Sequence, residues 1–163
     1  MTTFAFKNRG HGMPYGAPHD CAYKIHIDIP AMIANQPLDS EIASTGFGAA
    51  DILQIFEVPA GFLLQHVGVR VTTVEGGGAC TADIGGATAT QTHTAEDTGV
   101  GYMGTINLQS EATQTVLITD TDLGGSTTEG VVFITDGTID LTFVTAATAV
   151  AVFDVWAAGW KVF

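Results

Sequence analysis

The sequence predicts an all-β protein: an antiparallel β-sandwich or jelly roll of about eight strands with an extended N-terminal arm. Short apolar segments alternate with polar residues at a period of two, turn residues separate these segments, and helical periodicity is almost absent. A length of 163 residues is typical of one domain with a sizeable core. We therefore expect an arm at residues 1–22 and a single sandwich domain at residues 23–163.

The first predicted strand follows a stretch that lacks regular structure. Met1–Asp20 is expected to be an arm without elements, because Gly and Pro recur between positions 10 and 18 and break any period. Residues 23–29 then alternate cleanly, with Tyr23, Ile25, Ile27 and Ile29 facing a core and Lys24, His26 and Asp28 facing outward. Pro30 ends this strand, and a short helical turn is expected near Ala31–Asn35.

The stretch Ala50–Val74 is expected to form a hairpin of two strands joined at Val58-Pro59-Ala60-Gly61. Pro at the second position and Gly at the fourth suit a type I turn. In the second strand Val67, Val69 and Val71 form one apolar face. The first strand is apolar on both faces, with Leu53 and Ile55 opposing Ile52, Phe56 and Val58, which predicts a strand covered on both sides.

Further strands are expected at residues 79–84, 102–108, 115–119, 131–135, 138–144 and 149–156. The dipeptide Asp136-Gly137 predicts a hairpin with a type I′ turn, because that turn needs positive φ at both central residues. The last segment is apolar on both faces. Glu75-Gly76-Gly77-Gly78 is expected to be a flexible turn, and residues 85–101 and 120–130 are expected to be long loops.

Composition indicates a protein that makes extensive protein contacts. Charged residues are only 13% of the chain and the mean hydropathy is +0.31, which fits a surface largely covered by partners; a compact monomer is the alternative. The formal net charge of -12 argues against nucleic-acid binding. The Lys and Arg residues form no basic stripe along one predicted strand; they are Lys7, Arg9, Lys24, Arg70 and Lys161.

Two cysteines, Cys21 and Cys80, are too few for a disulfide framework, so free thiols are expected, with a bridge between them as the alternative. The sequence shows no signal peptide and no apolar run of membrane-spanning length. We expect synthesis in the cytoplasm and no membrane partner.

Motifs for catalysis, cofactors and metals are absent, so we expect no enzymatic activity and no cofactor. Asp120–Gly125 resembles the start of a calcium loop, but Gly124 and Val131 stand where ligands are required. The five histidines lack the spacing of zinc ligands. The candidate functional groups are therefore residues expected at the surface of the protein.

Charged residues in strands and aromatic residues near the C-terminus are the candidate surface groups. Asp28, Asp140 and Asp154 are expected to face solvent or pair with Thr hydroxyls, and Asp154, in an otherwise apolar strand, could face a subunit interface. Trp156, Trp160 and Phe163 are expected to plug one end of the sandwich; the alternative is that they anchor in a groove of a neighbour.

Four segments, residues 50–61, 68–77, 81–85 and 137–143, resemble small structural proteins encoded among the head genes of tailed bacteriophages, in particular capsid decoration (cement) proteins. This resemblance implies a β-sandwich subunit on the outside of a capsid, commonly a trimer, that clamps capsomers together. It assigns no active-site residue.

The resemblance implies the major capsid protein and other copies of the chain as partners, and a place on the virion exterior. We expect Lys7 and Arg9 of the arm to reach across the shell while the sandwich makes the trimer. The interface candidates are Lys7, Arg9, Tyr15, Asp154, Trp156, Trp160 and Phe163. The alternative function is a carbohydrate- or receptor-binding β-sandwich of a phage head fibre or tail, using Tyr102, His93 and loop carboxylates.

Overall fold

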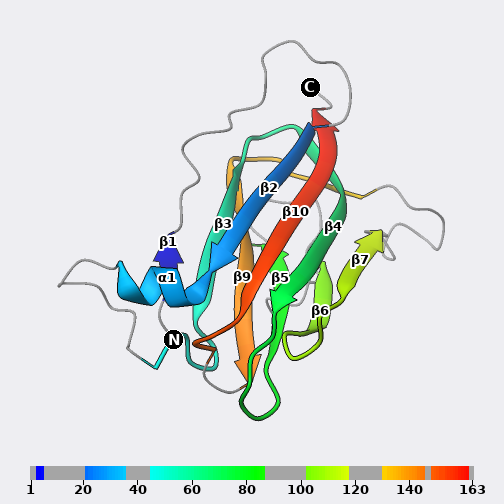
Figure 1. Ribbon diagram of the computed structural model, residues 1–163. Helices are drawn as coiled ribbons and strands as arrows, with labels where there is room; N and C mark the ends of the chain where they lie inside the picture. Colours follow the sequence, from blue (N-terminus) through cyan, green and yellow to red (C-terminus); the bar gives the residue numbers. More distant parts are fainter. Residues whose placement is uncertain are drawn as a thin grey trace.

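The protein is a sandwich of two β-sheets (Figure 1). The computed structural model describes residues 3–5, 21–35, 45–86, 102–117, 130–145 and 148–161. Sheet A consists, in spatial order, of β1 (Thr3–Ala5), β3 (Ile52–Val58), β9 (Gly137–Thr145), β5 (Thr81–Gly86) and β6 (Met103–Asn107). Sheet B consists of β2 (Cys21–Asp28), β10 (Val152–Lys161), β4 (Phe62–Thr73) and β7 (Thr113–Leu117), with the short β8 (Val131–Val132) also paired with β4.

The chain crosses repeatedly between the two sheets. Apart from the steps β5 to β6 and β7 to β8, each successive strand of the described residues lies in the sheet opposite its predecessor. Neighbouring strands are antiparallel, except that β1 pairs with β3 in parallel. The predicted all-β sandwich is therefore confirmed.

Both predicted hairpins are wrong, because each turn joins strands of different sheets. β3 pairs with β9, and β4 pairs with β10. The turn between β3 and β4 lies one residue later than expected: the Phe62 N–H donates to the Pro59 carbonyl at 3.3 Å, and Gly61 has φ +80° at the third position. That position requires Gly in a type II turn.

The second connection, from β8 to β9, has no type I′ turn. Gly137 begins β9 and is not among the described glycines with positive φ. β8 instead pairs with β4 of sheet B. Asp136 accepts a hydrogen bond from the Ala60 N–H at 2.9 Å, and the Gly61 N–H donates to the Phe133 carbonyl at 2.7 Å. The two crossovers therefore support each other at one end of the sandwich.

A β-bulge explains why β3 is apolar in both phases. The pairing of β3 with β9 shifts between Gln54 and Phe56, so Ile55 is an extra residue. As a result Leu53, Ile55, Phe56 and Val58 are all buried. The prediction that this strand is covered on both faces is wrong; one bulge turns residues of both phases toward the same core.

A single core fills the space between the sheets. It is built around the fully buried rings of Phe47, Phe62, Phe133, Phe143 and Phe153. Phe47 and Phe143 stack with ring centroids 4.7 Å apart. Ile25, Ile27 and Ile29 are buried, and Tyr23 packs against Phe56 and Phe62, as the alternation of this segment predicted.

The predicted helical turn is present as α1 (Ile29–Ala34), and it corrects the expectation for Asp28. The Asp28 carboxylate accepts a hydrogen bond from the Ala31 N–H at 2.8 Å and caps the helix. Pro30 lies in the first turn, where its missing N–H costs nothing.

Part of the N-terminal segment belongs to the sandwich. The sequence predicted no element within Met1–Asp20, but Thr3–Ala5 form β1 on the edge of sheet A. β2 begins at Cys21. The division of the chain at residue 22 remains a prediction.

Glu75 is buried, with 7% of its surface exposed, although the sequence predicted a flexible turn there. Its Oε2 accepts hydrogen bonds from the N–H groups of Ala149, Val150 and Ala151, at 2.9, 2.8 and 3.1 Å. One carboxylate thus satisfies three backbone donors in the loop that leads into β10.

Candidate functional site: the outer face of sheet B

The outer face of sheet B carries an ordered array of charged and aromatic side chains from β2, β10 and β4. These strands lie at the front of Figure 1, with no other labelled element before them. In β10, Phe153, Val155 and Ala157 are buried, whereas the alternating residues Asp154, Trp156 and Trp160 lie on the opposite face. We define the face by Lys24, His26, His66, Gly68, Arg70, Asp154, Trp156 and Trp160.

An ion-pair cluster lies at the centre of this face. Asp154 is opposite His26 of β2 and Arg70 of β4. The Asp154 Oδ2 is 3.0 Å from the Lys24 Nζ, and its Oδ1 accepts a hydrogen bond from the His26 Nδ1 at 2.9 Å. The hydrogen bond from His26, with a further contribution from Lys24, lowers the pKa of Asp154 against the opposing effect of burial. The carboxylate in an apolar strand is thus held by cross-strand partners, not by Thr hydroxyls.

The indole of Trp156 lies directly over β4. Trp156 is opposite Lys24 on one side and Gly68 on the other. A Cβ at position 68 would lie 2.3 Å from the indole, so only glycine leaves room for this ring. The ring packs against β4 at Gly68, and part of Trp156 stays accessible.

Trp160 lies further along the same face, where 37% of its surface is exposed. It is opposite the half-buried Leu63, which is in turn opposite the half-buried Val132 of β8. This end of the face is therefore apolar. The expectation that Trp156 and Trp160 plug the end of the sandwich is wrong, because both lie outside the core.

Three of the predicted interface residues, Asp154, Trp156 and Trp160, are thus neighbours on one face. Lys7, Arg9, Tyr15 and Phe163 lie outside the described residues. Sequence reasoning did not join Lys24, His26, His66 and Arg70 to this group. These residues belong to strands far apart in the chain, and only cross-strand register brings them together; the period of two did show that each faces outward.

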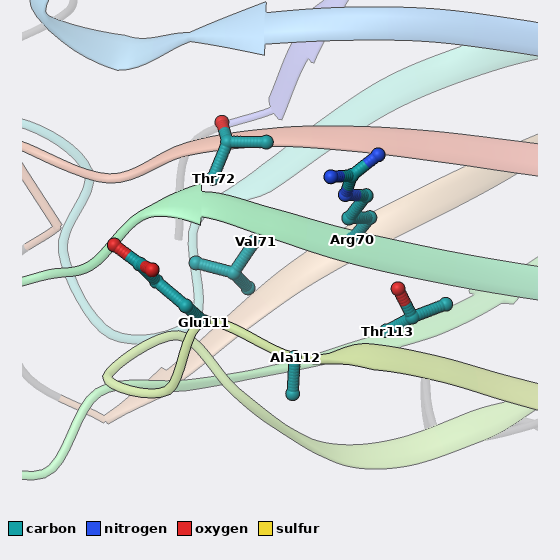
Figure 2. Close-up of a pocket in the computed structure, with 6 residues that line it drawn as sticks. All are labelled: Arg70, Val71, Thr72, Glu111, Ala112 and Thr113. Atoms are coloured by element: carbon teal, nitrogen blue, oxygen red, sulfur yellow. The ribbon is translucent and has the colours of Figure 1, made fainter.

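A shallow pocket of about 330 Å³ borders the face where β4 meets the start of β7. Figure 2 shows its lining residues, with Arg70 and Thr72 projecting to one side of β4 and Val71 to the other. Arg70, Thr72, Glu111 and Thr113 are exposed, and the Val71 N–H donates to the Ala112 carbonyl at 3.1 Å. The pocket extends the outer face of sheet B.

Other candidate chemistry is limited. Among the described residues, no three His, Cys, Asp or Glu side chains are placed to hold a metal ion. Cys80 is a buried free thiol with its Sγ 2.7 Å from the Thr148 Oγ1, so a bridge to Cys21 is not formed. Burial raises the pKa of this thiol. In the described part of the chain, no helix has the length and apolarity needed to span a membrane.

Tyr102, the aromatic residue expected to contact sugar in the carbohydrate-binding alternative, is not on the surface. Tyr102 is only 5% exposed and packs in the core. His93, the second residue invoked for that function, lies outside the described residues.

Two solved structures of phage capsids contain chains of similar fold. A chain in the structure of the cyanophage Pam1 capsid asymmetric unit aligns over 93% of this chain and 89% of its own length, with a TM-score of 0.54 and 11% identity. A chain in the capsid of Ralstonia phage GP4 aligns over 97% of this chain and 99% of its own length, with a TM-score of 0.57 and 11% identity. No protein-family description matches the sequence, and no curated protein does.

Proposed function

We propose that this chain is a structural virion protein that decorates and stabilises the outside of a tailed-phage capsid, as a trimer that bridges capsomers. Its partners are the major capsid protein and other copies of itself. The observation that carries the proposal is the near-complete alignment, in both directions, with chains from two phage capsid structures. The resemblance of the sequence to head proteins of tailed phages agrees with it.

The strand order supports the same proposal. Eight strands, all except β1 and β8, have five residues or more. When these eight are renumbered 1 to 8 in chain order, the strand order is 1-8-3-6 in sheet B (β2-β10-β4-β7) and 2-7-4-5 in sheet A (β3-β9-β5-β6). We assign this order to the jelly-roll class, which viral capsid domains commonly use.

Charge and composition fit a place on the outside of a DNA-filled shell. A formal net charge of -12 repels the phosphates of packaged DNA and keeps the free protein soluble. The proposal accordingly includes no nucleic-acid partner, no membrane partner and no enzymatic activity. It places synthesis in the host cytoplasm and the mature protein on the capsid exterior.

The proposal is tested by adding purified protein to capsids that lack it and measuring co-sedimentation. We expect saturable binding and an increased resistance of the capsids to heat. Deletion of Met1–Asp20 is expected to reduce the occupancy at least about tenfold, since the arm is proposed to reach across the shell. Because that deletion also removes β1, the variant Lys7→Gln with Arg9→Gln serves as a control that retains Thr3–Ala5. Absence of binding by the full chain would refute the proposal.

A further inference from the structure

The strands at the edges of the two sheets differ in length and regularity. Within the described residues, the edge strand β1 has three residues and the edge strands β6 and β7 have five each, whereas β2 has eight. β2 contains no Gly or Pro, and its pairing with β10 runs from Cys21 to Asp28 without a register shift. β2, the outermost strand of sheet B in Figure 1, therefore presents the longest regular edge of the described chain.

The edge at β6, by contrast, is interrupted by a bulge. The pairing of β5 with β6 shifts between Ala82 and Ile84, and Thr105 of β6 has φ +58°, in the left-handed region that β-branched residues avoid. The Thr105 N–H donates a hydrogen bond to the Asp83 Oδ1 at 2.6 Å, which holds the bulge in place. A bulge of this kind protects an edge strand from pairing with another chain.

The backbone groups at the outer edge of β2 follow from its pairing with β10. The Ile29 N–H donates to the carbonyl of Ala151, the residue directly opposite in the same register, at 3.3 Å. Bonded residues alternate along an antiparallel pair, so the odd-numbered residues of β2 bond to β10, and the N–H and C=O groups of Lys24 and His26 point away from it. No described strand lies on that side to accept or donate these bonds.

The charged side chains of β2 do not guard this edge. The Lys24 Nζ is 3.0 Å from the Asp154 Oδ2, and the His26 Nδ1 is 2.9 Å from the Asp154 Oδ1. Because Asp154 belongs to β10, both side chains extend toward the middle of sheet B and away from its outer edge. β2 thus lacks the bulge, the proline and the projecting charge that usually protect an edge strand.

We propose that the outer edge of β2 pairs with the outer edge of β2 on a second copy of this chain. A strand that adds to β2 needs a free and regular edge of its own, and β2 has the longest such edge among the described strands. Two β2 strands related by a two-fold axis run antiparallel and contribute the same residues, so the contact closes at two copies. Sheet B then continues from one copy into the other.

The two-fold contact goes beyond the proposed function and differs from the contact that holds a trimer. In the proposed assembly it joins one copy of a trimer to one copy of a neighbouring trimer. The paired edges are about 26 Å long, at about 3.3 Å for each of the eight residues of β2. A contact made mainly of backbone hydrogen bonds along one strand is weak in dilute solution, and the high effective concentration of copies held on one shell strengthens it.

Amide hydrogen exchange of the full-length chain, measured by NMR at about 10 μM and about 1 mM, tests this pairing. We expect the amides of Lys24 and His26 to exchange at least about threefold more slowly at the higher concentration, because pairing gives them acceptors. The amides of Ile25 and Ile27, which bond to β10, should be protected at both concentrations. Edge amides that exchange equally fast at both concentrations would overturn the inference.

A pair of variants isolates the edge N–H from the side chain. His26→Pro removes the N–H, and proline is tolerated in an edge strand where the N–H faces outward. His26→Ala is the matched control, because it removes the same bond to Asp154 and keeps the N–H. In sedimentation equilibrium at about 1 mM, we expect the mean mass of the wild type and of His26→Ala to exceed that of His26→Pro by at least about half.

Urea unfolding verifies that both variants remain folded. Equal masses of folded His26→Ala and His26→Pro would overturn the inference. The exchange measurement on the wild type does not depend on either variant.

Hydrogen exchange of residues 21–28, followed by mass spectrometry with and without capsids, separates the inference from the proposed function. Protection that requires capsids shows that the shell supplies the added strand, which overturns the self-pairing and supports the proposed function. A wild type that pairs through β2 but never binds capsids supports the inference and refutes the proposed function.

Discussion

At the residue scale, Glu75 shows how one side chain can hold a long connection. Its Oε2 accepts from three consecutive N–H groups, those of Ala149, Val150 and Ala151, and the side chain is buried. Hydrogen bonds to a charged acceptor contribute more than neutral ones, and a buried donor left without a partner costs about 1–3 kcal/mol. Nothing in the motif Glu-Gly-Gly-Gly indicates this role, because the donors lie more than seventy residues away.

Glu75→Ala is therefore expected to lower the free energy of unfolding by about 3 kcal/mol, since three N–H groups lose their acceptor. Urea unfolding followed by fluorescence measures the change. Glu111→Ala, at an exposed carboxylate, is the matched control and should change stability by less than about 0.5 kcal/mol. Equal effects of the two substitutions would contradict this account.

Asp140 predicts a stability change that depends on pH. Burial raises the pKa of its carboxyl, opposed in part by a hydrogen bond with Thr138, and its Oδ1 has no hydrogen-bond partner among the described residues. The unfolded chain therefore releases the proton at lower pH than the folded one. Stability attributable to this group decreases as pH rises from the unfolded pKa, about 3.9, through the folded pKa.

Asp140→Asn is expected to stabilise the protein at neutral pH and to have little effect below pH 3, where both forms of the chain are protonated. Chemical unfolding at the two pH values measures this difference. Glu111→Gln removes the same charge at an exposed position and controls for net charge. A variant that is less stable than the wild type at neutral pH would show that the ionised carboxylate has a partner.

At the element scale, the structure departs from the sequence prediction at the two turns. The chain does turn near Pro59–Gly61 and bends just before Gly137, as the turn residues indicated, but each connection leads into the opposite sheet. The alternation of apolar and polar residues in a strand shows which side chains are buried. The same alternation results whether the next strand in the chain pairs with it in one sheet or lies across the core in the other sheet. Hydrogen bonds between the two crossovers, such as that from Ala60 to Asp136, are non-local and invisible in either turn alone.

An engineered disulfide distinguishes a crossover from a hairpin. Glu57 and Thr138 are directly opposite each other in the antiparallel pair β3–β9, so cysteines there are within reach of a disulfide. We expect the double variant Glu57→Cys with Thr138→Cys to form a disulfide readily on oxidation. The double variant Glu57→Cys with Leu63→Cys should form none, because residues 57 and 63 face outward from opposite sheets. Peptide mapping of the non-reduced protein identifies the disulfide in each variant. A disulfide between positions 57 and 63 would contradict the crossover and show that β3 and β4 form a hairpin.

At the scale of the whole molecule, the core is one cluster shared by both sheets, so neither sheet can be packed without the other. Phe153, on the inner strand β10 of sheet B, is fully buried within it. Phe153→Ala is expected to cost about 3–5 kcal/mol and to leave a single cooperative transition. Calorimetry measures both properties. Val144→Ala, at a side chain 42% exposed, should change stability little, and separate transitions for the two sheets would contradict the single core.

The distribution of charge also belongs to the whole molecule. Composition alone indicates an acidic protein and excludes a basic footprint for nucleic acid. It does not show that Lys24 and Arg70, 46 positions apart in the sequence, lie on one face with Trp156 between their strands. That surface exists only because β10 is inserted between β2 and β4.

By itself the sequence determined the all-β class, the side chains that enter the core in β2 and at Val67, Val69 and Val71 of β4, the helical turn after Asp28 and the acidic character of the chain. These properties depend on the period of two, on local turn residues and on composition. Only the tertiary structure decided which sheet each strand joins, that a bulge reconciles the two phases of β3, and which charged and aromatic residues become neighbours. The physical reason is that strand pairing is a contact between distant segments, and burying the inward face of a strand stabilises it equally in either sheet.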